Sequence, residues 1–142
     1  MTFSSVNYVA ILVAAIAAWL AGAAWYMVLG KVWMAALGIA PEMKQAEMRK
    51  PGAFLPFIYA FASEVIMAWV LAGLLFHISG SQPTVRAGVI SGGLCWLGFV
   101  FTTTLVNYSF ARRDTRLLLI DTGHWLVVLL LMGAILGGLG GR

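Results

Sequence analysis

The stretch that most constrains the fold runs from Arg116 to Gly138. After Arg116 its only ionisable residues are an aspartate at Asp121 and a histidine at His124, in an otherwise largely apolar run. A helix of this length and apolarity can cross the hydrocarbon core of a bilayer. Asp121 and His124 are three residues apart, so they share one helical face. Because ionisable groups inside a membrane helix usually face protein or a water-filled cavity, the sequence predicts a helical bundle arranged around this face.

The composition extends this interpretation to the whole chain. The 142 residues are 62% hydrophobic and 10% charged, whereas a soluble domain has about 45–50% apolar and about 25% charged residues. We predict an all-α fold, a single transmembrane domain over residues 1–142 with spans at residues 6–29, 53–76, 84–108 and 117–138. The first apolar run is too long for a signal peptide and has no Lys or Arg before it, so we expect it to be retained.

The connections between the spans predict the topology. Residues 30–52 form the first connection, in which Pro41 opens a short surface helix that Pro51 and Gly52 end. The basic residues of the first and third connections are Lys31, Lys44, Arg49, Lys50, Arg112, Arg113 and Arg116. Arg86 and Arg142 lie on the opposite side. The positive-inside rule therefore predicts that both basic connections are cytoplasmic and that both termini are non-cytoplasmic.

Polar side chains inside the spans are concentrated towards the predicted cytoplasmic side. Glu64, Asp121 and His124 are candidates for a proton or ion relay, in which Asp121 orients His124 and Glu64 exchanges a proton with that pair. Further polar and aromatic residues of the same third could line a cavity open to the cytoplasm: Trp25, Tyr26, Thr103 and Asn107. The alternative is that these groups only bond to one another and hold the helices together.

Small residues repeat at helical spacing in three of the spans. The residues we expect at close helix contacts are Gly22, Gly88, Gly92, Gly133 and Gly137. These faces exceed what one small bundle needs, so we expect a homo-oligomer or a larger membrane complex.

Several function classes lack support in the sequence. No basic face with interleaved aromatic residues suggests nucleic-acid binding, and no Cys/His spacing suggests a metal site. Hydrolase and nucleotide-binding motifs are absent, so we expect no enzymatic activity and no cofactor. Trp19 and Trp96, near mid-membrane, could stack on a planar ligand, but packing against small residues is the commoner explanation. Two functions remain open: a small transporter or channel, and a non-catalytic accessory subunit of a membrane complex.

Three stretches of the chain resemble a bacterial membrane family known as domain of unknown function 1761. They are Ala21–Tyr26 with Gly30–Met34, Trp96–Phe99 with Thr103–Phe110, and His124–Leu126 with Met132–Gly137. The family often has Ser-Pro after the Trp-Tyr pair, where this chain has Met27 and Val28. The resemblance implies a four-helix protein of the bacterial inner membrane and implies no activity.

Overall fold

The computed structural model describes residues 7–80 and 82–139, which are all-helical and contain no strand. The elements are α1 (Tyr8–Leu37), α2 (Pro41–Met48), α3 (Leu55–Ser79), α4 (Val85–Cys95), the π-helical segment η2 (Trp96–Phe101), α5 (Thr102–Phe110) and α6 (Thr115–Leu139). Four helices are long and apolar enough to cross a membrane, with α4, η2 and α5 counted as one. The prediction of an all-α fold with four apolar helices is confirmed. Val6, where the first span was predicted to begin, and Arg142 lie outside the described residues.

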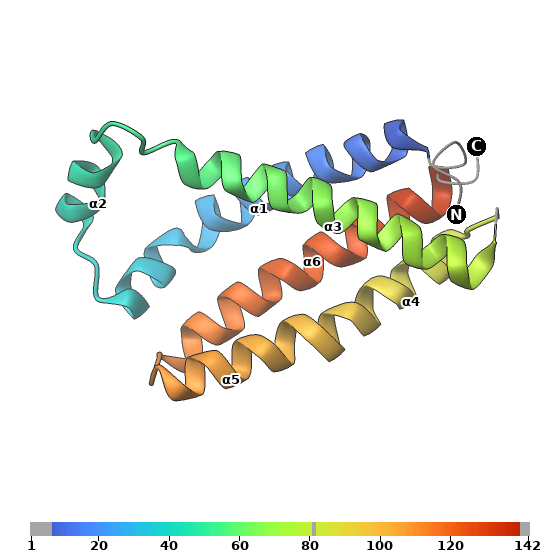
Figure 1. Ribbon diagram of the computed structural model, residues 1–142. Helices are drawn as coiled ribbons and strands as arrows, with labels where there is room; N and C mark the ends of the chain where they lie inside the picture. Colours follow the sequence, from blue (N-terminus) through green and yellow to red (C-terminus); the bar gives the residue numbers. More distant parts are fainter. Residues whose placement is uncertain (1–6, 81, 140–142) are drawn as a thin grey trace.

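Helix α6 forms the centre of the bundle. It packs against α1 on one side and α4 on the other, and α1 also packs against α3. Figure 1 shows α6 running between these neighbours, with the start of α1 and the end of α6 at one end of the molecule and α2 at the other. Of the four candidate spans, α6 has the largest buried share and the α4–α5 helix the smallest. The bundle is therefore arranged around the stretch that carries Asp121 and His124.

The first helix is longer than the predicted span. It continues through Met27 and Val28 and includes Lys31 and Trp33, which we had placed in a polar connection. No proline or glycine pair interrupts residues 31–37, so nothing stops the helix there. It ends at Gly38, which has a φ of 71° and donates its N–H to the carbonyls of the last turn. This extension brings Trp33 alongside α6.

Glycine allows the backbones of α4 and α6 to touch. A Cβ built on Gly88 would lie 1.8 Å from the carbonyl oxygen of Gly133, and one on Gly92 would lie 2.4 Å from that of Leu129. Further along, a Cβ on Gly137 would lie 2.2 Å from the carbonyl oxygen of Thr84. No larger residue fits these positions without moving a helix, which is why glycine recurs at this spacing.

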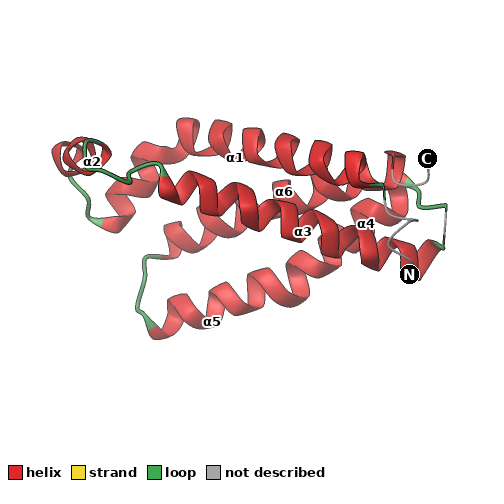
Figure 2. Cartoon of the chain, turned by 45° about the horizontal axis from the view of Figure 1, so that its top comes forward, coloured by secondary structure: helices red, strands yellow, loops and turns green. Residues whose placement is uncertain are grey.

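A π-helical turn, which the sequence did not predict, interrupts the third span between α4 and α5. The hydroxyls of Thr102 and Thr104 donate to the carbonyl oxygens of Gly98 and Val100, at 2.8 and 2.7 Å. These bonds satisfy carbonyl groups around the wider turn. Beyond it, α5 makes few contacts with α6, and Figure 2 shows the two helices joined by a loop at their far end.

Candidate functional site

Asp121 is the acceptor at the centre of a hydrogen-bond cluster that joins three helices. Its Oδ1 accepts from the hydroxyl of Tyr26 at 2.7 Å and from the indole Nε1 of Trp33 at 2.9 Å, both on α1. Its Oδ2 accepts from the hydroxyl of Tyr108 on α5 at 2.7 Å. A carboxylate only accepts, and all three neighbours donate, so the cluster suits an ionised Asp121 without a basic partner.

Two further indoles fix the same turn of α6 through its backbone. Trp25 Nε1 donates to the carbonyl oxygen of Ile120 at 3.1 Å, and Trp96 Nε1 donates to that of Thr122 at 2.7 Å. The two carbonyls flank Asp121 in the sequence. Aromatic donors from α1 and η2 therefore hold the carboxylate in position from both sides.

His124 lies one turn deeper than Asp121 and is 7% exposed. Its ring contacts the rings of Tyr26 and Trp125, with centroid distances of 5.1 and 4.7 Å. A Cβ on Gly22 would lie 2.7 Å from His124 Nε2, so the absence of a side chain at Gly22 makes room for the imidazole. His124 Nδ1 is buried and has no hydrogen-bond partner in the described protein.

Glu64 is the second buried ionisable group and is 2% exposed. It belongs to the stripe of α3 that also buries Ala68, Leu71 and Leu75 against the rest of the bundle. Its Oε2 has no hydrogen-bond partner in the described protein. Glu64 and His124 each lie nine residues into their helices, or about 14 Å at 1.5 Å per residue, and α3 contacts α6. The two unpartnered groups are therefore at similar depth, on neighbouring helices.

The comparisons with known proteins identify the family. The sequence profile of the protein family of unknown function DUF1761 matches residues 9–137, nearly the whole chain. The chain belongs to the DUF1761 family. No curated protein and no solved structure matches it.

In this DUF1761 member, the residues of the predicted relay are not joined to one another by hydrogen bonds within the described part of the chain. Asp121 and His124 share a face of α6, but no hydrogen bond joins them in the described part of the chain, because the carboxylate oxygens bond to Tyr26, Trp33 and Tyr108. Tyr26 contacts both residues, since its hydroxyl donates to the Asp121 carboxylate and its ring packs on the His124 imidazole.

The four residues expected at a polar cavity also fall into two groups. Trp25 and Tyr26 belong to the cluster around α6, whereas Thr103 and Asn107 are exposed on α5 and make no hydrogen bond to that cluster among the described residues. Sequence reasoning did not assign Tyr108 to the site. The available signal was that Tyr26 and Tyr108 each precede basic residues at the same end of their helices.

Among the residues that the structure describes, no three His, Cys, Asp or Glu side chains gather closely enough to hold a metal ion. The ionisable groups of the site are the hydrogen-bonded Asp121 carboxyl, the buried His124 imidazole and the buried Glu64 carboxyl.

Proposed function

We propose that this protein is a small multi-pass transporter or channel of the bacterial inner membrane, in which Glu64 and His124 relay protons or small cations. The observation that carries the proposal is the pair of unpartnered atoms, Glu64 Oε2 and His124 Nδ1. They are the two buried side-chain polar atoms without a partner in residues 7–80 and 82–139.

Unpartnered polar atoms are unusual in a folded protein. Buried polar groups are nearly always hydrogen-bonded, and one left unsatisfied costs about 1–3 kcal/mol. Elsewhere the bundle satisfies donors that are only partly buried, including the indoles of Trp25 and Trp96. The exceptions at Glu64 and His124 are therefore explained if both groups exchange a proton or contact a transported ion. Ionisable residues at membrane depth commonly mark such pathways.

The Asp121 cluster lies between these groups and the basic end of the bundle. Asp121 is six residues into α6 and His124 is nine, so a proton or cation entering at that end meets the carboxylate first. The basic residues of the connections support a cytoplasmic placement of this end, with both termini outside. Tyr26 links the two steps because it contacts both Asp121 and His124.

The α4–α5 helix favours assembly beyond one chain. It is the least buried of the four candidate spans and exposes Leu94, Leu97 and Phe99. A homo-oligomer would bury this face and enclose a pathway that one small bundle is too narrow to enclose. The same exposed face favours our second candidate function, an accessory subunit that packs against a larger membrane complex.

Proton flux into proteoliposomes tests the proposal. Purified protein is reconstituted with a pH-sensitive dye inside, and a potassium gradient with valinomycin drives proton entry. We expect flux above that of empty liposomes, and at least a tenfold loss in Glu64→Gln and in His124→Ala. The matched controls are Glu42→Gln on α2 and His77→Ala at the far end of α3, both at exposed positions.

Two results would count against the transport proposal. One is a wild-type flux equal to that of empty liposomes, for protons and for small cations alike. The other is unchanged flux in both Glu64→Gln and His124→Ala. Purification of the native protein as a stoichiometric part of a larger assembly, together with absent flux, would instead support the accessory subunit.

A further inference from the structure

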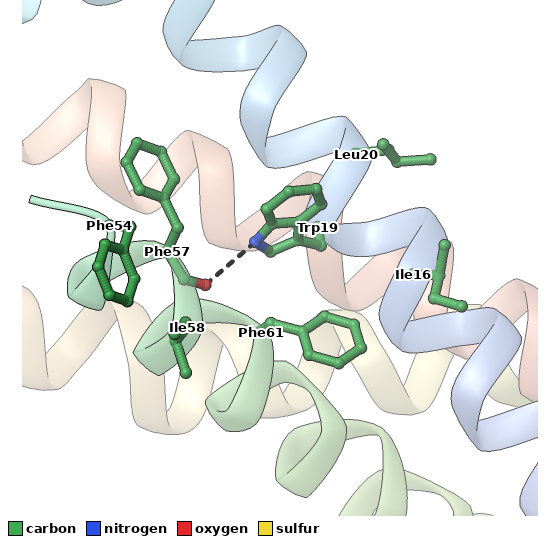
Figure 3. Close-up of a pocket in the computed structure, with 7 residues that line it drawn as sticks. All are labelled: Ile16, Trp19, Leu20, Phe54, Phe57, Ile58 and Phe61. Atoms are coloured by element: carbon green, nitrogen blue, oxygen red, sulfur yellow. Dashed lines mark hydrogen bonds between the residues drawn. The ribbon is translucent and has the colours of Figure 1, made fainter.

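A groove of about 420 Å³ lies between α1 and α3, away from the Asp121 cluster. Trp19 and Leu20 of α1 form one wall, and the other is formed by Phe54, which directly precedes α3, with Phe57 and Phe61 of α3. Figure 3 shows the indole of Trp19 directed at the backbone of Phe57, whose carbonyl oxygen accepts from Nε1 at 3.3 Å. This contact engages the indole donor, so the groove offers an occupant only apolar surface. Its volume falls within the range of ligand pockets, about 300–1,000 Å³.

The groove begins at the end of α3 that follows the first basic connection. Phe54 precedes α3 and Phe61 is in its second turn, so the walls extend about 10 Å along the helix from the basic end of the bundle. Leu20 and Phe57 are also exposed on the outer surface, so the groove is open to its surroundings rather than enclosed. An extended hydrocarbon chain entering from the side matches both the depth and the apolar lining.

Two basic residues lie close to the groove along the chain. Arg49 and Lys50 come directly before it in the sequence and are exposed. Two tight turns keep the connection between these residues and α3 compact. The Ala53 N–H donates to the Lys50 carbonyl oxygen at 3.2 Å, and the Leu55 N–H donates to the Gly52 carbonyl oxygen at 2.9 Å. Even a fully extended chain of this length would keep the Cα atoms of Lys50 and Phe54 within about 14 Å of each other, and the turns shorten that span. Lys50 pairs with Glu47, whereas Arg49 makes no ion pair within the described residues.

We propose that this groove binds one acyl chain of an anionic phospholipid, whose headgroup contacts Arg49 and Lys50. The apolar groove selects a hydrocarbon chain, and the basic connection selects a negative headgroup over a zwitterionic one. The whole end of the bundle supports this choice, since seven basic residues there outnumber the acids Glu42, Glu47 and Asp114. The lipid site does not depend on the proposed transport function.

Native mass spectrometry of the full-length protein in detergent tests the site, with phosphatidylglycerol and phosphatidylcholine as competing probes. We expect one tightly retained phosphatidylglycerol per chain. Each basic residue near a membrane surface contributes about 1 kcal/mol of attraction, so Arg49→Gln/Lys50→Gln should weaken the preference over phosphatidylcholine by about tenfold to thirtyfold. Arg112→Gln/Arg113→Gln is the matched control, because it removes the same charge at the same end from the other connection.

A second pair of variants tests the groove itself. Leu20→Trp fills it and should abolish the retention of either lipid, whereas Val28→Trp, at an exposed position of α1 outside the groove, should not. Equal loss of preference in the two charge variants would overturn the proposal, because it would show general attraction and no site. Four other results would also overturn the proposal: retention without a headgroup preference, a co-purifying neutral hydrophobic molecule in the groove, dimerisation that Leu20→Trp disrupts, or no retained lipid.

Discussion

Replacing Asp121 with alanine should destabilise the bundle more than any other single polar substitution at the site. The carboxylate accepts three hydrogen bonds from two other helices, from Tyr26, Trp33 and Tyr108. Interhelical hydrogen bonds in membrane proteins contribute on average about 0.6 kcal/mol and at most about 1.7 kcal/mol each. Asp121→Ala should therefore lower the free energy of unfolding by about 2–5 kcal/mol. Tyr26→Phe and Tyr108→Phe should each lower it by about 0.6–1.7 kcal/mol.

A double-mutant cycle separates this cluster from general packing. The free energy of unfolding is measured in bicelles by steric trapping for the wild type, Asp121→Ala, Tyr26→Phe and the double variant. If the Tyr26 hydroxyl acts through the carboxylate, Tyr26→Phe should cost almost nothing once Asp121 is alanine. The reasoning is refuted if Tyr26→Phe costs the same in both backgrounds, or if Asp121→Ala unfolds like the wild type.

Two further predictions concern packing and pH. Gly88→Ala should destabilise the protein by about 1–3 kcal/mol because its Cβ would meet the backbone of Gly133. Gly93→Ala should be close to neutral because the nearest neighbour of its Cβ is a side-chain atom at 3.7 Å. Thermal unfolding in detergent compares the two variants, and equal stability would contradict the close contact. In the loop before α6, hydrogen bonds from Arg116 lower the pKa of the half-buried Asp114 carboxyl below its ordinary value. The stabilisation from this pair should therefore be present above the unfolded pKa of about 3.9 and be lost as the pH falls through the lower folded value. An NMR titration should show the Asp114 pKa rising in Arg116→Gln, and an unchanged pKa would contradict the pairing.

The fold was largely predictable because apolar stretches of membrane length leave few alternatives. Four long helices and the surface helix at Pro41–Met48 follow from hydropathy and from the position of proline. Helix ends were less predictable where composition changes without a stop signal. Residues 31–37 show this, since their charge and aromatic content indicated an interface, but the backbone continues as helix until Gly38.

The site was only partly predictable, because sequence gives depth along a helix but not its neighbours. Counting residues brought Asp121, His124 and Glu64 into one half of the membrane. It did not show that Trp33 and Tyr108 would supply donors to Asp121, which depends on the extension of α1 and on the position of α5 after the π-helical turn. The groove at Trp19 depends on the packing of α1 against α3 and has no signal in either helix alone.

Infrared difference spectroscopy of the reconstituted protein tests the central claim, that Glu64 is an interior carboxyl which exchanges protons. Spectra are recorded during a pH titration, and the carbonyl band of a protonated carboxyl group is followed in the wild type, in Glu64→Gln and in the exposed control Glu42→Gln. We expect a titrating band that is present in the wild type and in Glu42→Gln and is missing in Glu64→Gln. A titrating band that persists unchanged in Glu64→Gln, or no titrating interior carboxyl in the wild type, would contradict it.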